Sequence, residues 1–181
     1  MTRDGTPFGE DIQALLVERL RAGLWLFFCG IAVFAVGDPF VHPDKLWPLA
    51  FMKLLDVTAV LLSFAMLHGP HARERAVAVA ILFICVLSAS SAASGIITND
   101  AATTPILLSA IGMGTATLLP WGVRAQLVTQ MVAGFCVLWN VASVDGGKGV
   151  TYVPVAVLIG SFASVYAAYM LERYRRDRRR A

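Results

Sequence analysis

The chain has 181 residues, of which 57% are hydrophobic and 15% are charged, and its formal net charge at pH 7 is +3. Its mean hydropathy of +0.69 is too high for a water-soluble domain of this length, so the composition predicts an integral membrane protein. The basic residues gather near the ends of apolar segments, and no pattern of alternating basic and aromatic residues suggests a nucleic-acid partner.

The sequence predicts an all-α fold, a six-transmembrane-helix bundle in a lipid bilayer with both termini cytoplasmic. A cytoplasmic segment, residues 1–21, precedes the membrane domain, residues 22–171, and a basic cytoplasmic helix, residues 172–181, follows it. The six predicted spans are residues 22–37, 46–67, 76–97, 104–119, 125–142 and 152–171. All twelve arginines then fall on the cytoplasmic side, whereas Lys45 and Lys148 fall on the outer side, and this bias sets the orientation.

The N-terminal region has two open interpretations. Residues 9–21 carry apolar side chains at helical spacing among charged ones, which is typical of a short amphipathic helix on the inner membrane surface. The same residues could instead extend the first span into the cytoplasm. That span is short, and we expect Asp38 and Pro39 to end it.

The second span contains the only charged residues inside any predicted span, Lys53 and Asp56. They are three residues apart, so they share one helix face and could pair. A charge at such a depth costs about 2.5–3.5 kcal/mol on insertion scales, which makes each a functional candidate. One interpretation is a ligand or proton site facing the bundle interior. The other is a self-neutralised pair in which Lys53 extends to the membrane surface.

The third span contains a run of small residues, residues 88–95. Ser88 with Ala92, and Ser91 with Gly95, are four residues apart and would let another helix approach closely. We therefore expect this run to be a helix contact, although the same residues could line a pocket.

The fourth span is short, and we expect Thr104 to cap it ahead of Pro105. A Pro-Trp-Gly turn follows, with Trp121 expected at the membrane interface. The fifth span contains Gln126 in its first turns and Asn140 near its outer end.

Polar residues of the outer loops form a further set that could gather into a cation or ligand site, or could be ordinary solvated loop residues: Asp38, His42, Asp44, Asn99, Asp100, Thr103 and Asp145. From these considerations the candidate ligand-binding residues are Lys53, Asp56, Ser91, Asp100 and Asn140.

The sequence predicts no cofactor, no metal site and no enzymatic activity. His42, His68 and His71 lie in loops, whereas a membrane haem needs histidines on facing spans. Lys53 lies too near the membrane surface for a retinal Schiff base. The three cysteines are far apart without histidines beside them, which argues against zinc. The sequence has no catalytic motif.

The last span passes without a break into the C-terminal segment, where six arginines occupy the final nine positions. One interpretation is that these charges stop the transfer of the chain across the membrane. The other, favoured by the unbroken helix, is that this segment begins a helix that transmits a signal. The candidate signal-transmission residues are Leu171, Glu172, Arg173, Tyr174 and Arg175.

The chain resembles the six-helix N-terminal membrane modules that precede PAS, histidine kinase, diguanylate cyclase or class III nucleotide cyclase domains in bacterial receptors. The resemblance covers about residues 15–181. The matching stretches are residues 100–105 (DAATTP), 117–122 (TLLPWG) with Gln126, 138–140 (LWN) and 169–175 (YMLERYR).

The resemblance implies a sensory or anchoring module of the bacterial inner membrane, commonly a homodimer, as in two-component systems. Such a module acts on a cytoplasmic output domain of the same protein, where any histidine kinase or nucleotide cyclase activity would reside. The sequence contains no such domain, so we expect one to follow in a longer protein. The alternative function is a small transporter or channel that uses Lys53 and Asp56.

Overall fold

The computed structural model describes residues 7–144 and 152–178. The regular secondary structure in these ranges consists of α-helices and one 3-10 turn. The predicted all-α class is confirmed. The elements are α1 (Pro7–Val41), the 3-10 turn η1 (Pro43–Lys45), α2 (Leu46–Met66), α3 (Ala72–Thr98), α4 (Thr103–Leu118), α5 (Val123–Ser143) and α6 (Tyr152–Arg178).

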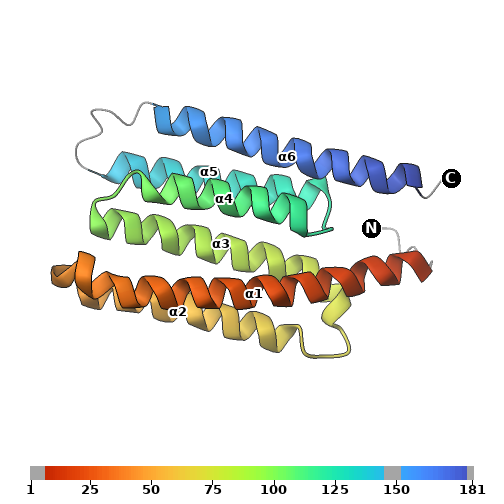
Figure 1. The fold of residues 1–181 in the computed structure, drawn as a ribbon, viewed down its shortest axis with the longest axis horizontal. Helices are drawn as coiled ribbons and strands as arrows, with labels where there is room; N and C mark the ends of the chain where they lie inside the picture. The colour runs from red at the N-terminus through yellow and green to blue at the C-terminus, as the bar shows by residue number, and fades with distance from the viewer. Residues whose placement is uncertain (1–6, 145–151, 179–181) are drawn as a thin grey trace.

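The six helices form two sets of three that lie side by side (Figure 1). Helices α1, α2 and α3 pack against one another, as do α4, α5 and α6, and the two sets meet chiefly where α3 packs on α5. Helix α1 begins and α6 ends at the same end of the bundle, which we call the basic end because its described helix ends carry arginines. The opposite end, with η1 and the α3–α4 loop, is the far end.

Helix α1 is one continuous helix of 35 residues, so residues 9–21 belong to the helix of the first span, and their cytoplasmic location stays a prediction. Leu16, Leu20 and Leu24 are almost completely buried against the bundle, which explains why this segment does not lie apart as a surface helix. The expectation that Asp38 and Pro39 end the helix is wrong. Pro39 lies in the last turn, where its missing N–H removes only one helical hydrogen bond, and the helix continues to Val41.

Five of the described helices, all but α4, are long and apolar enough to cross a membrane. Helix α4, the fourth predicted span, has 16 residues and is therefore about 24 Å long, less than the hydrocarbon core of about 30 Å. It packs against α6 and α5. The segments at residues 1–6 and 179–181, and the loop with Asp145 and Lys148, lie outside the described residues.

The small residues of α3 lie in a close helix contact, as the sequence predicts. Ser88 and Ala92 are buried, and α3 contacts helices of both sets. At Gly95 the approach is so close that a Cβ atom would collide with Asn140 of α5 and Thr104 of α4. This contact fixes the α3–α4 loop over the far end, where the candidate site lies.

Candidate functional site

A cavity of about 410 Å³ opens at the far end of the bundle, between α1, α2, α3, the α3–α4 loop and the start of α4. Four of the five predicted ligand-binding residues line it, namely Lys53, Asp56, Ser91 and Asp100. Its remaining lining residues are Val33, Phe34, Gly37, Asp38, Val41, His42, Leu49, Ser94, Gly95, Thr98, Thr103, Thr104 and Leu107. Both interpretations of the small-residue run on α3 thus hold, because it forms a helix contact and a cavity wall.

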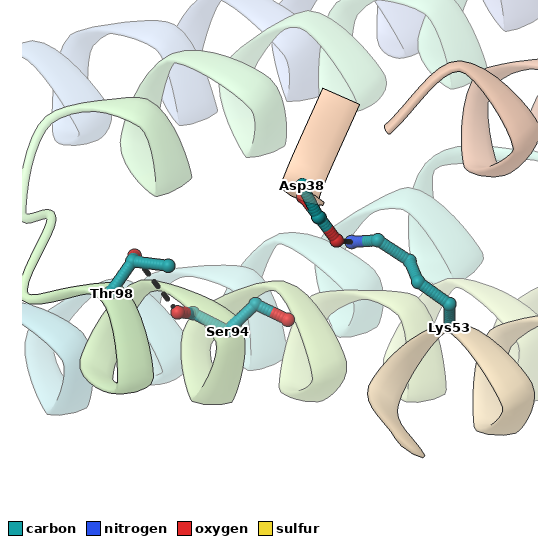
Figure 2. A network of polar contacts seen from close by, with 4 residues as sticks. All are labelled: Asp38, Lys53, Ser94 and Thr98. Carbon is teal, nitrogen blue, oxygen red and sulfur yellow. Dashed lines mark hydrogen bonds and ion pairs between the residues drawn. The ribbon is translucent and has the colours of Figure 1, made fainter. Parts of the chain in front are cut away.

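Lys53 forms an ion pair with Asp38 of α1 (Figure 2); among the described residues no ion pair within 4.0 Å joins it to Asp56 on its own helix face, although its charge still acts on Asp56. Its Nζ atom lies 3.9 Å from Oδ2 of Asp38 and 5.4 Å from the ring centroid of Phe34, a cation–π distance. Both charged side chains are mostly buried, with exposed fractions of 17% and 16%. The continuation of α1 through Asp38 places this carboxylate within reach of α2, which corrects the expected Lys53–Asp56 pairing.

Asp56 is the most buried charged residue of the cavity, with 6% of its surface exposed. Its Oδ1 atom has no well-aligned hydrogen-bond partner among the residues that the structure describes, although the buried hydroxyl of Ser90 on α3 and the charge of Lys53 lie near enough to interact with this carboxylate. A buried carboxylate without full pairing is strongly destabilising, so this position is costly for folding alone.

The wall formed by α3 exposes hydroxyl groups and small side chains to the cavity. The Oγ1 atom of Thr98 donates a hydrogen bond of 3.0 Å to the backbone oxygen of Ser94 (Figure 2). The Oγ1 atom of Thr104 donates one of 3.2 Å to the backbone oxygen of Ser91. The first bond lies within α3, and the second joins α4 to α3 beside the cavity.

Ala102 directly precedes α4 and offers no side-chain cap, and Asp100, two residues earlier, caps the start of the helix in place of Thr104. Its Oδ1 atom accepts hydrogen bonds from the backbone N–H groups of Ala102 at 2.8 Å and Thr103 at 3.0 Å. Thr104 is directed to α3 instead, so the expected cap is wrong. Burial raises the pKa of Asp100, but the hydrogen bonds from Thr103 and Ala102 outweigh it and hold this pKa below its ordinary value.

We expect Asp100→Ala to lower the free energy of unfolding by about 1 kcal/mol at neutral pH, because the cap is lost. The pKa of Asp100 is lower in the folded state, so this contribution is present at neutral pH and disappears as the pH falls through the folded-state pKa. The difference in Tm between the variant and the wild type, followed by circular dichroism in detergent, should therefore shrink in acid. A difference that does not change between neutral pH and about pH 3 would contradict this assignment.

Asn140, the fifth predicted ligand-binding residue, lies behind the cavity and does not line it. It is completely buried, and its Nδ2 atom donates to the backbone oxygens of Ala92 and Asp100, each at 3.3 Å. Asn140 therefore connects α5 to the loop that carries Asp100.

A second polar cluster lies nearer the basic end and centres on Gln126 of α5. Gln126 is completely buried; its Oε1 accepts from Nε1 of Trp121 at 2.9 Å, and its Nε2 donates to Oγ of Ser164 on α6 at 2.6 Å. Nε2 also lies 2.9 Å from the backbone oxygen of Gly112 on α4. Trp121 is buried in the bundle, and its indole N–H has a partner there; its position relative to the membrane interface stays a prediction.

Helix α6 continues through the predicted signal-transmission residues and contacts α5 at the basic end. Oε2 of Glu172 accepts a hydrogen bond of 3.0 Å from the backbone N–H of Val123, the first residue of α5. Leu171 is half-buried. Arg173 is exposed, and its Nε atom lies 4.0 Å from Oδ2 of Asp177 in the next turn. Tyr174 is exposed and Arg175 is half-buried. No sequence pattern indicates the Glu172 contact, because a contact with the start of a distant helix leaves no local pattern.

Five long apolar helices packed around buried polar clusters define an integral, multi-pass membrane protein. Comparison of the chain with protein-family models, with curated proteins and with solved structures found no match. No family is therefore identified, and the resemblance to bacterial receptor modules stays a prediction.

Proposed function

We propose that the chain is the membrane input module of a signal-transduction receptor, in which the far-end cavity binds a small ligand and α6 carries the response. The basic end is then cytoplasmic, in agreement with the arginines in the sequence. The receptor acts as a homodimer in a bacterial inner membrane, and its output domain follows α6.

The observation that carries this proposal is that α5 is hydrogen-bonded to the cavity at one end and to α6 at the other. At the far end Asn140 donates to the backbone of Asp100, which lines the cavity. Toward the basic end Gln126 donates to Ser164, and the N–H of Val123 donates to Glu172. A ligand that moves the α3–α4 loop therefore biases α5, and α5 biases the position of α6.

Helix α6 suits this role because it is continuous from Tyr152 to Arg178. A continuous helix transmits rotation and axial shift, whereas a flexible linker does not. Each residue inserted into a helix turns everything beyond it by about 100°.

The test is a reporter kinase fused to the full chain, with one to four alanines inserted after Arg175. We expect the basal kinase activity to vary with the helical phase of the insertion, so that four alanines restore much of the activity that two remove. Immunoblots of membrane fractions control for the amount of protein. Equal activity for all insertions would contradict transmission through α6.

A second candidate, a small transporter or channel, is favoured by the charged residues Lys53 and Asp56 in the cavity wall. Proteoliposomes test it. A transporter shows solute flux that Asp56→Asn abolishes, and a receptor module shows none for any solute in a broad panel.

A further inference from the structure

We propose that the far-end cavity binds a small organic cation of the alkylammonium class. This inference deepens the proposed function and rests on it for the role of the cation as a stimulus. The binding itself is measurable without any signalling output, so failure of one proposal is distinguishable from failure of the other.

The balance of charge in the cavity wall is negative. Asp38, Asp56 and Asp100 oppose the single cation Lys53, with His42 counted as neutral. Because the Nζ atom of Lys53 already lies near Asp38 and over the ring of Phe34, this lysine is not available to bind an anion. The cavity therefore favours a cation.

Two of the three carboxylates already have compensating partners. Asp38 has Lys53, and Asp100 accepts two backbone N–H groups at the start of α4, where the helix dipole also favours a negative charge. Asp56 remains as the carboxylate with a buried oxygen, Oδ1, that has no hydrogen-bond partner among the described residues, although the Ser90 hydroxyl and the Lys53 charge lie near enough to interact with it. It is the residue that a bound cation would stabilise.

The chemistry of the wall selects an ammonium group on an apolar body. An ammonium group supplies a positive charge and hydrogen-bond donors, and such charge-assisted bonds are about twice as strong as neutral ones. The apolar side of the cavity includes Val33, Leu49 and Leu107, which suit an alkyl chain. Among the described residues no group of three or more His, Cys, Asp or Glu side chains could hold a metal ion, which disfavours a bare divalent cation.

The size of the cavity agrees with this class of ligand. Its volume of about 410 Å³ lies in the lower part of the range of small-molecule sites, roughly 300–1,000 Å³. Such a cavity accommodates an amine with a short chain or ring, but not a folded protein segment.

The test is isothermal titration calorimetry of the purified full chain in nanodiscs, with n-butylammonium as the probe and butyrate as the matched anion. We expect n-butylammonium to bind with a Kd of about 1 mM or tighter, which a ligand of this size can reach. Butyrate should not bind. Asp56→Asn should weaken amine binding about tenfold or more, since a charged partner is lost.

Two further variants make the result specific to the cavity. Asp44→Asn removes an exposed carboxylate of η1 that does not line the cavity, and it should bind the amine as the wild type does. Ser94→Trp fills the cavity without changing its charge and should abolish binding even if Asp56→Asn fails to fold. Absence of amine binding at about ten times the expected Kd, or equal binding by wild type, Asp56→Asn and Ser94→Trp, overturns the proposal.

Discussion

Gln126→Leu is expected to cause a large loss of stability, about 2–4 kcal/mol in the free energy of unfolding. Leucine has a similar volume but cannot accept the N–H of Trp121 or donate to Ser164 and Gly112. The indole N–H would be left buried without a partner, and α4, α5 and α6 would lose a shared contact. Denaturation of the purified protein in mixed micelles, followed by circular dichroism, measures the loss.

Leu127→Ala is the matched control, because Leu127 is the next residue of α5 and its side chain is about half exposed on the outside of the bundle. It should change the stability much less than Gln126→Leu does. If Gln126→Leu unfolds at the same denaturant concentration as the wild type, the Gln126 cluster does not hold α4, α5 and α6 together.

Gly95→Ala is the second substitution with a large expected effect, about 1–3 kcal/mol of destabilisation from overpacking. The new Cβ would lie 2.9 Å from the backbone oxygen of Asp100 and would collide with the side chains of Asn140 and Thr104. Since a backbone oxygen cannot rotate away as a flexible side chain can, the α3–α4 loop must shift. The same denaturation experiment measures the effect.

Gly134→Ala controls for the intrinsic effect of alanine in a helix. A Cβ at Gly134 of α5 meets nothing within 4 Å, so alanine there should be neutral or stabilising by up to about 1 kcal/mol. Equal behaviour of the two variants would show that the close contact at Gly95 is not as tight as the structure indicates.

Much of the fold follows from the sequence because apolar length is a strong signal in membrane proteins. The predicted spans at residues 46–67, 76–97 and 125–142 agree with α2, α3 and α5 to within a few residues. The errors lie at helix ends. Pro39 is tolerated because it lies near the C-terminal end of α1. The N-terminal segment joins α1 because Leu16 and Leu20 are buried, and their burial depends on tertiary contacts.

The candidate site was predictable in part because charged residues stand out against an apolar span. Charges inside an apolar helix, at Lys53 and Asp56, are conspicuous, and both line the cavity. The ion-pair partner of Lys53 was not predictable, because Asp38 comes from a helix that was expected to end at this residue. That these residues bind a ligand stays a prediction.

The polar clusters on α5 illustrate a second limit of the sequence. Gln126 and Asn140 are separated by 14 positions, and no local pattern indicates which neighbouring helix each contacts. The structure places one beside α6 and the other beside the α3–α4 loop. The coupling that we propose between the cavity and α6 therefore depends on tertiary geometry that the helix pattern does not encode.

The central claim, that the state of the cavity reaches the end of α6, is tested most directly by filling the cavity in the reporter fusion. Ser94→Trp occupies the cavity as a ligand would, whereas Leu138→Trp adds the same side chain on an exposed face of α5. At equal amounts in the membrane, we predict that Ser94→Trp changes the activity of the fused kinase several-fold and that Leu138→Trp leaves it unchanged. Wild-type activity in Ser94→Trp, with the protein folded and inserted, would contradict the account.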